Sequence, residues 1–436
     1  MAHRVRAKRN VKSAVRGFDS PSDGLANTSI DRFSDHLPAG LTLRRFLVSA
    51  YGPTLLASLG YGAVVPMLAL QAIAIGANAG LAALIAALVG VGQVAGDLPA
   101  GMLTNRFGER KTLAASCLVD ALLLTSVFFV HNVGLFAIIA FAHGMTASVL
   151  ALARQTYLTV VVPLPWRARA MSSLGGVMRV GYFVGPLFGA LIIKAHSMGA
   201  VFLLAGVMSA AAAAATLAMP DITATSPPSP SEPAKTVGTW EVLKAHRHTL
   251  LGLGWGILAI MLVRTARQVY VPLWCHTNGM DPATTNLVYA ASMAAEVLLF
   301  FPGGVIMDRL GRWWVTVPTV VAMSACFAVM PWTHSVWAVT VVSVLLGVAN
   351  GISSGIVATL GADVSPDVGR PQFLAGWRVF SDIGSSAGPL VISLVTVVAS
   401  LSVAGWVLAV LGWAGAAQLA RLMPMSGQLP QSQPRT

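Results

Sequence analysis

Charged residues are scarce in this chain. Of its 436 residues only 10% are Asp, Glu, Lys or Arg, whereas 56% are hydrophobic. A soluble domain of ordinary composition carries about 25% charged residues. The chain therefore has too few charges to cover a water-exposed surface of its size, and its composition excludes a large soluble enzyme.

Cysteines and catalytic motifs are also few or missing. The three cysteines, Cys117, Cys275 and Cys326, are widely separated and form no C-x-x-C or C-x-x-H spacing, so neither a disulfide framework nor a metal site is predicted. The sequence contains no H-E-x-x-H or P-loop motif, which are the signatures of metalloproteases and of many nucleotide-binding proteins. We expect no catalytic residues, no cofactor and no ATPase domain.

Long apolar runs, in contrast, are abundant. A helix that crosses a bilayer needs about 20 mainly apolar residues, and continuous apolar runs favour helices over barrel strands, which alternate. The predicted fold is an all-α membrane protein with twelve transmembrane helices. They lie at about 46–70, 80–103, 111–130, 135–158, 171–194, 199–218, 249–274, 285–307, 313–331, 336–360, 373–395 and 400–421.

The formal net charge of +12 leaves nucleic acid open as a partner until the charges are placed. Nine Lys or Arg residues lie in the first 45 residues, and most others lie in alternate gaps between apolar runs. Cytoplasmic loops of membrane proteins show this bias. We therefore expect a multi-pass protein of a bacterial-type plasma (inner) membrane, with both termini cytoplasmic, lipid around it and no nucleic acid bound.

The two halves of the chain repeat each other. An offset of 203 residues superimposes Pro99 on Pro302, Gly144 on Gly347 and Arg167 on Arg370, while Pro66 and Pro272 match at 206. Six helices in each half make the repeats parallel. Parallel repeats are a transporter architecture, with the substrate site near mid-membrane.

The chain is predicted to act as a monomer. Its predicted parts are a basic tail (1–45), a first six-helix bundle (46–218), a Pro/Ser-rich linker (219–248), a second bundle (249–421) and a tail (422–436). The segment 239–246 within the linker is predicted to form a short amphipathic helix.

Two loops carry a duplicated motif. GMLTNRFGERK at 101–111 and GVIMDRLGRWW at 304–314 resemble the G-x-x-x-D-R-x-G-R-R/K signature of the major facilitator superfamily, with Asn105 in place of Asp and Trp313 in place of a basic residue. The resemblance covers about 46–421 and implies the fold of that superfamily. Gly181, Gly185 and Pro186 are similar to the antiporter signature of its drug/proton antiporter branch, but the Arg-x-x-x-Gly signature of the fourth helix is not clearly present.

These motifs predict a gate at the cytoplasmic side. Gly101 and Gly304 are expected to let neighbouring helices approach closely, and Arg106 and Arg309 to meet the negative ends of helix dipoles; alternatively, the arginines only anchor topology. Asp97 is expected to join this cluster. The predicted gate residues are Asp97, Gly101, Asn105, Arg106, Gly108, Arg110, Gly304, Asp308, Arg309, Gly311 and Arg312.

A second set of residues is predicted to shape helices. Proline disturbs the helical hydrogen-bond ladder, and glycine permits tight contact between helices. A kink, a tight contact or ordinary packing all fit this pattern. The set comprises Gly181, Gly185 and Pro186 with their repeat partners Gly384, Gly388 and Pro389.

Ionisable groups at membrane depth are costly and usually functional. Glu296, near the middle of the eighth helix, is the first candidate for proton coupling or for binding a cationic group; the alternative is a structural partner for a buried Arg. Arg378 and Asp382, four residues apart, predict an intrahelical ion pair in the cavity.

Three arginines and two other ionisable residues at membrane depth remain. Arg264 and Arg267 are candidates for attracting an anionic substrate or closing an outer gate, with snorkelling to the surface as the alternative. Arg179 is a deep cation of the cavity. Asp120 and His143 also lie near mid-depth, but a lone histidine on an apolar helix is more often a packing residue, so no role is predicted for them.

The sequence therefore predicts a secondary transporter that moves a small organic molecule by alternating access. The resemblance in the fifth helix favours proton-coupled efflux of an amphipathic compound. The alternative is an importer of a small, possibly anionic solute, as the arginines would suit. A membrane-embedded enzyme or receptor is a remote third possibility, since no cluster of nucleophile, base and metal-type residues lies at one depth.

Overall fold

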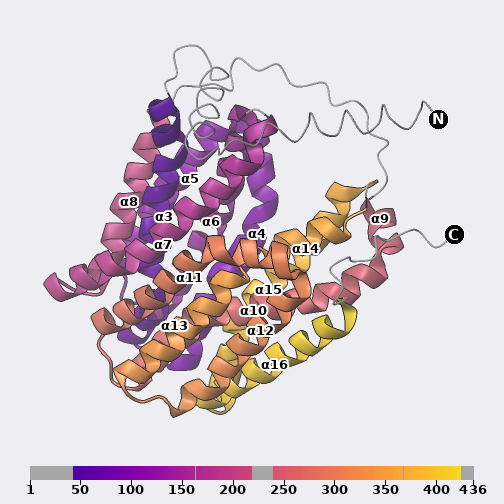
Figure 1. The fold of residues 1–436 in the computed structure, drawn as a ribbon. Helices are drawn as coiled ribbons and strands as arrows, with labels where there is room; N and C mark the ends of the chain where they lie inside the picture. Colours follow the sequence, from indigo (N-terminus) through magenta and orange to yellow (C-terminus); the bar gives the residue numbers. More distant parts are fainter. Residues whose placement is uncertain (1–42, 163, 219–238, 367, 424–436) are drawn as a thin grey trace, which may run out of the picture. The chain divides into compact units, whose positions relative to one another are not determined.

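The computed structural model describes residues 43–162, 164–218, 239–366 and 368–423, all of them in helices and short turns. The predicted basic tail, most of the linker and most of the C-terminal tail lie outside these residues. The first half contains α3 (Leu43–Ala74), α4 (Ala79–Phe107), α5 (Glu109–Val127), α6 (Val133–Val161), α7 (Leu164–Ala195) and α8 (Gly199–Leu217), coloured indigo to magenta in Figure 1.

The second half begins with the short helix α9 (Thr239–Ala245), as the sequence predicts. The remaining elements are α10 (Arg247–Thr277), α11 (Pro282–Leu310), α12 (Arg312–Val329), the 3-10 turn η1 (Met330–Trp332), α13 (Val336–Ile352), α14 (Ile356–Val364), α15 (Arg370–Val398) and α16 (Leu401–Leu422). Val242 of α9 is buried in the second half's own hydrophobic cluster beside Phe373. The end of the linker is therefore part of the second bundle.

The prediction of an all-α membrane protein is confirmed. Eleven spans among the described residues are long and apolar enough to cross a membrane. The helix α5 corresponds to the remaining predicted span, and its 19 residues contain Arg110, Lys111 and Asp120. The helix α5 is as long as some of the eleven spans, but its charges make it less apolar than they are.

The tenth predicted span is wrong in one respect, because it is not one continuous helix. It divides into α13 and α14, with Ser353, Ser354 and Gly355 between them. A break within the membrane frees backbone carbonyls, which must find other hydrogen-bond donors. The donors here are side chains of the candidate site described below.

Side-chain caps begin the helices at one end of the bundles, which we name the capped end. Asn78 Oδ1 accepts from Leu81 N at 2.8 Å and Asn132 Oδ1 from Leu135 N at 3.0 Å. Their repeat partners at offset 203, Asp281 and Ser335, cap α11 and α13 in the same way. Ser197 and Ser400 form a third pair at this offset, accepting from Ala200 N and Val403 N, both at 3.3 Å. These polar residues satisfy helix N–H groups that lack a partner within the helix.

The other end, which we name the motif end, carries the duplicated loops. Gly108 and Gly311 follow α4 and α11 with φ of +80° and +92°, a region that favours glycine because it has no side chain. Each donates its N–H to the carbonyl four residues earlier, Thr104 O and Met307 O. The glycines of the motif therefore end one helix and turn the chain into the next.

The repeat extends to helix contacts. A Cβ at Gly144 would overlap the carbonyl oxygen of Val89, and a Cβ at its partner Gly347 would overlap that of Ser292. Gly185 meets Leu59 O and Gly388 meets Leu262 O. All these pairs are related by 203, so the offset of 206 that Pro66 and Pro272 predict for the first and seventh helices is wrong.

The two halves pack together at the capped end. One hydrophobic cluster there includes Ala63 and Phe202 of the first half and Leu262, Tyr270 and Phe327 of the second. Ser393 Oγ of α15 donates to Gly80 O of α4 at 2.8 Å. Toward the motif end the halves have separate clusters, a large one in the second half and a small one around Cys117 in the first. The largest hydrophobic cluster of the described residues therefore joins the halves at the capped end.

Candidate functional site

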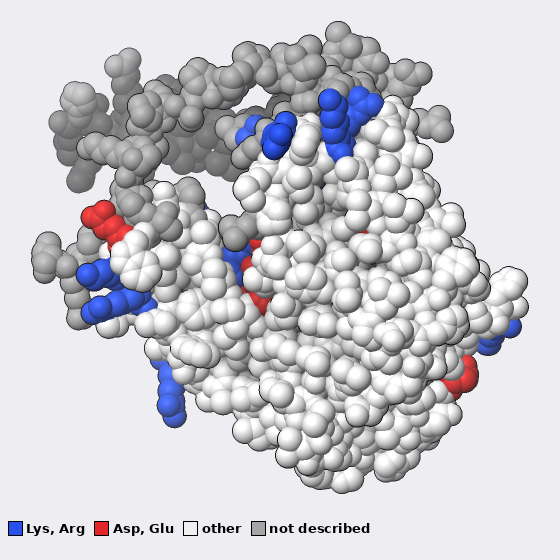
Figure 2. All heavy atoms as spheres, turned by 180° about the vertical axis from the view of Figure 1, so that it is seen from behind, with Lys and Arg blue, Asp and Glu red and all other residues white. Residues whose placement is uncertain are grey.

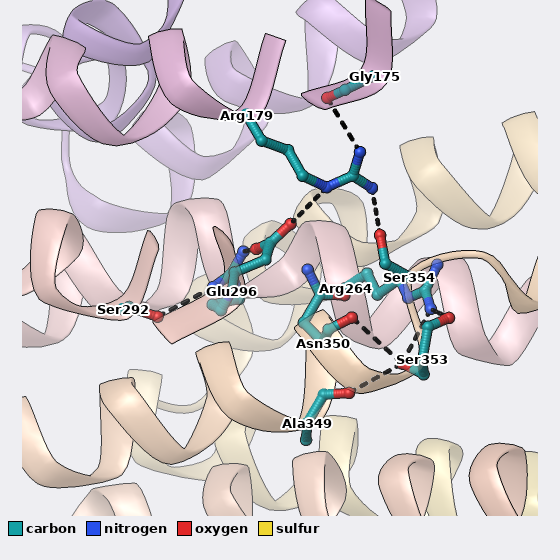
Figure 3. Close-up of polar contacts among 10 residues, drawn as sticks. Gly175, Arg179, Arg264, Ser292, Glu296, Ala349, Asn350, Ser353 and Ser354 are labelled. Atoms are coloured by element: carbon teal, nitrogen blue, oxygen red, sulfur yellow. Dashed lines mark hydrogen bonds and ion pairs between the residues drawn. The ribbon is translucent and has the colours of Figure 1, made fainter. Parts of the chain in front are cut away.

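Glu296 of α11 lies at the centre of a charged cluster that joins the two halves. Its Oε2 is 2.7 Å from Nη2 of Arg267 on α10, and its Oε1 is 3.9 Å from Nε of Arg179 on α7. Arg267 Nη1 also donates to Ser292 Oγ at 2.9 Å. One carboxylate thus contacts an arginine of its own half and an arginine of the other half (Figure 3).

Two of these arginines donate hydrogen bonds to residues at the break between α13 and α14. Arg264 Nη2 donates to the carbonyl oxygen of Ser353 and, at 2.9 Å, to its hydroxyl. Arg179 donates to Ser354 Oγ and, at 3.2 Å, to Gly175 O of its own helix (Figure 3). The arginines therefore supply donors to the backbone and hydroxyls exposed by the break, as irregular backbone at membrane depth requires.

This central cluster (Arg179, Arg264, Arg267 and Glu296) contains three arginines and one carboxylate. The side chain of Arg267 is only 3% exposed, so the alternative in which it snorkels to the surface is wrong. Arg179 lies over the ring of Phe300, with Cζ 3.9 Å from the centroid, which adds a cation–π contact. Glu296 is therefore the partner of a buried Arg, as the structural alternative expects, and a role in proton coupling stays a prediction.

A second cluster lies nearer the motif end and also bridges the halves. Arg378 of α15 lies 3.4 Å from Asp382 Oδ2 on the same helix, which confirms the predicted intrahelical pair. It also lies 3.4 Å from Asp97 Oδ1 on α4 of the first half. Ser148 of α6 donates to the same Asp97 oxygen. The described partners of Asp97 therefore lie on α6 and α15 and not in the loop motifs, and its membership of the gate cluster stays a prediction.

One cavity of about 340 Å³ between the halves is lined by Arg179, Val297 and Phe300. Two further cavities, of about 150 and 160 Å³, also lie between the halves. The smaller contains Asp97, Arg378 and Asp382, and the larger is lined by Tyr61, His143, Gln268 and apolar side chains. Both include Gly90, Gln93 and Ser385, so they are adjacent. Figure 2 shows acidic and basic atoms together in a recess of a surface that is otherwise largely uncharged.

Sequence reasoning missed one buried pair. Asp120 Oδ1 is 2.6 Å from Nδ1 of His143 on α6, and Asp120 Oδ2 accepts from Ser209 Oγ of α8 at 2.8 Å. The available signal was the similar depth of Asp120 and His143. Nothing in the sequence says that α5 and α6 turn these faces toward each other.

The loop motifs hold helix ends together. Arg312 lies 3.2 Å from Asp308 and 3.1 Å from Asp363. Arg110 donates to Thr216 O at 3.4 Å and to Leu217 O at the end of α8. Its repeat partner Trp313 donates from Nε1 to Ala420 O near the end of α16 at 3.4 Å. The indole therefore replaces the usual basic residue as a donor to the carbonyl end of a helix.

Other gate residues do not behave as predicted. A Cβ at Gly101 or Gly304 would meet no atom within 4 Å beyond its own helix, so the predicted close helix approach at these two glycines is wrong. Arg106 and Arg309 are exposed. Arg106 lies over Phe107 at 5.5 Å, and neither arginine makes an ion pair with a residue that the structure describes. The side chain of Asn105 lies outside the described residues.

The glycines of the antiporter-like signature make tight helix contacts. A Cβ at Gly181 would lie 2.6 Å from Ser58 Cβ on α3, and one at Gly384 would lie 2.9 Å from Leu258 Cα on α10. The helices α7 and α15 continue through Pro186 and Pro389. Of the three predicted roles, a kink, tight contact between helices or ordinary packing, tight contact between helices is confirmed at these glycines.

Comparisons with known proteins agree with this architecture. The family model described as Major Facilitator Superfamily matches residues 54–278 and 253–434. Among solved structures, a POT family transporter in complex with 5-aminolevulinic acid has a TM-score of 0.69 at 12% identity, covering 90% of this chain and all of that one. A D-xylose-proton symporter has a TM-score of 0.68 at 14% identity, covering 88% and 99%.

A curated relative, the multidrug resistance protein MdtG of Salmonella arizonae, is 29% identical over 168 residues. The match covers 38% of this chain and 42% of the relative, so the chain spans less than half the length of that protein. This relative agrees with the resemblance to the drug/proton antiporter branch. The family model covers most of the sequence, and the chain belongs to the major facilitator superfamily.

Proposed function

We propose that this chain exports a small amphipathic compound in exchange for protons. It works as a monomer in the plasma (inner) membrane, with both termini in the cytoplasm. The observation that carries the proposal is the position of Glu296 between Arg267 of its own half and Arg179 of the other half. The charge of this carboxylate therefore affects how strongly the two halves attract each other.

The first step of the argument is the state of the two halves. They share one hydrophobic cluster at the capped end and have separate clusters toward the motif end. Alternating access requires two arrangements, each closed at one end. The described conformation is one of these, open toward the cytoplasm if the basic loops mark that side.

The second step is the charge of Glu296. A proton on this carboxyl removes its attraction for both arginines, while a deprotonated carboxylate draws Arg179 toward α11. Glu296 therefore binds a proton more tightly in one arrangement of the halves than in the other. Proton coupling requires such a difference. Resemblance of the Gly181-to-Pro186 segment to the antiporter signature, and the multidrug resistance relative, favour export.

Replacement of Glu296 by Gln tests this function. We expect inside-out vesicles to accumulate ethidium in response to a proton gradient with the wild-type chain. The Glu296→Gln chain should accumulate at least about tenfold less, while ethidium exchange without a gradient stays within about twofold. Glu241→Gln, on the exposed helix α9, is the matched control and should transport normally. Persistent gradient-driven accumulation in Glu296→Gln would remove Glu296 as the coupling group.

A second candidate function is import of a small organic anion. The observation that favours it is the excess of three arginines over one carboxylate in the central cluster. Desolvated guanidinium groups are suited to bind a carboxylate. Right-side-out vesicles separate the two functions, because uptake of a radiolabelled monocarboxylate above that of empty vesicles would favour import over export.

A further inference from the structure

A buried acid–histidine pair in the first half has no part in the function proposed above. Asp120 and His143 are 8% and 4% exposed, on α5 and α6. Both carboxylate oxygens are occupied. Oδ1 lies 2.6 Å from His143 Nδ1 and 3.0 Å from Thr146 Oγ1, and Oδ2 accepts from Ser209 Oγ at 2.8 Å. Three helices thus hold one carboxylate in the arrangement of an ionised acceptor.

The histidine ring separates this carboxylate from the central cavity. His143 lines the cavity of about 160 Å³ together with Tyr61 and Gln93 of its own half and Gln268 of the other half. The ring of Tyr61 stacks on the imidazole, with centroids 6.0 Å apart. Asp120 does not line this cavity. The imidazole is therefore the part of the pair that faces the space between the halves.

The geometry determines which nitrogen can take a proton. With Nδ1–H donating to Asp120, the neutral ring has an unprotonated Nε2, which has no hydrogen-bond partner among the described residues. Protonation at Nε2 forms an imidazolium beside a carboxylate. The pair then changes from one net negative charge to none. A buried charge that is paired costs less than one without a counter-ion, and histidine is the side chain that titrates near neutral pH.

Other ionisable groups lie around the pair, but among the described residues Asp120 is the one charged group that contacts the ring. Tyr182 stands 5.3 Å from Tyr61, measured between ring centroids. Cys117 of α5 and Arg154 of α6 lie on the same helices as the pair, and Tyr289 of α11 belongs to the other half. Across the cavity, Thr265 and Gln268 of α10 lie next to Arg264 and Arg267, and Ser385 of α15 lies near Asp382.

We propose that His143, held by Asp120, is a proton-binding site on the wall of the central cavity, separate from Glu296. The repeat partners of Asp120 and His143 at offset 203 are Met323 and Leu346, and the partner of Glu296 is Gln93. Each half therefore carries one proton-binding site, at positions that the repeat does not relate. The site stands on its own geometry and does not depend on the role of Glu296.

Nitrogen NMR of histidine-labelled protein in lipid nanodiscs tests the site directly. The chain has nine histidines, and the His143→Asn variant identifies the signals that belong to His143. In the wild-type chain these signals should change from a neutral ring protonated at Nδ1 to an imidazolium between about pH 5 and 8. A ring that stays in one state across this range, or a neutral form protonated at Nε2, would overturn the proposal.

Two variants separate this site from its alternatives. In Asp120→Asn the imidazolium should form only at a pH at least about one unit lower, because its counter-charge is gone; an unchanged transition means that Asp120 does not hold the proton. In Glu296→Gln the transition of His143 should remain. If it disappears there, His143 is not a separate site, whereas loss of coupled transport alone leaves the proposal intact.

Discussion

The two halves of the chain share a scaffold but differ in the charges that lie at membrane depth. Caps, loop glycines and helix contacts recur at the offset of 203, as in Asn78 and Asp281 or Gly144 and Gly347. Most membrane-depth charges do not recur, since Glu296 corresponds to Gln93 and His143 to Leu346, and where both positions are ionisable, Arg179 and Asp382, the sign is opposite. The repeat therefore accounts for the contacts between helix backbones, whereas each half has its own ionisable residues at membrane depth.

The largest expected effect comes from breaking the buried pair of the second half. Arg267→Met leaves Glu296 with Arg179 alone, at 3.9 Å, and should lower the free energy of unfolding by about 3–5 kcal/mol. The offset partners of Arg267 and Glu296 are Val64 and Gln93. Thermal unfolding in detergent measures the loss.

The double variant Arg267→Met/Glu296→Leu makes the second half resemble the uncharged first half at these positions. It should regain most of the lost stability, because removal of both charges leaves no buried ion without a partner. Coupled transport should stay absent. A single variant as stable as wild type would mean that the pair does not hold the structure.

A smaller effect is expected where the halves are alike. Gly144→Val and Gly347→Val place side chains against the backbone of α4 and α11, and each should cost about 1–3 kcal/mol. The two losses should agree within about 1 kcal/mol. Gly101→Ala and Gly304→Ala, where a Cβ meets no other helix, are controls that should lose no stability. Unequal losses would show that the repeated contacts are not equivalent.

The smallest effect concerns the capped end. Asn78→Ala and Asp281→Ala should each cost about 1 kcal/mol, the usual value of a helix N-cap. Hydrogen bonds from Thr284 lower the pKa of Asp281 below its ordinary value. The contribution of Asp281 is therefore present above about pH 4, the pKa of an unfolded aspartate, and is lost as the pH falls through the lower folded value.

Asn78 has no such dependence on pH, which makes it the matched control for Asp281. Thermal unfolding of both variants between about pH 3 and 7 measures the difference. Equal pH profiles for Asn78→Ala and Asp281→Ala would contradict the assigned role of the Asp281 carboxylate.

Much of the scaffold could be predicted from the sequence because its signals are local. Apolar runs of bilayer length predict the helices, and glycine after a helix predicts the turns at Gly108 and Gly311. The pair of Arg378 and Asp382 was also predictable, since residues four apart share a helix face. The partner of Arg378 in the other half, Asp97, was not, because 281 residues separate them.

The broken tenth span marks another limit. Its hydropathy is that of one helix from Val336 to Val364, although the Asn350-Gly351 and Ser354-Gly355 dipeptides at the interruption are typical of turns. The interruption is stable in this fold because Arg264 and Arg179, distant in sequence, donate to Ser353 and Ser354.

The sequence by itself determined that this chain is a membrane-embedded, duplicated helical protein. Hydrophobicity and helix length are properties of neighbouring residues, and the repeat is visible as a constant offset of 203 along the chain. Only the tertiary structure decided which charges meet. Helix faces separated by tens to hundreds of residues are brought together by packing, and this placed Glu296 between Arg267 and Arg179 and His143 beside Asp120. A buried charge depends on its partners for its chemistry, so the candidate site belongs to the folded chain.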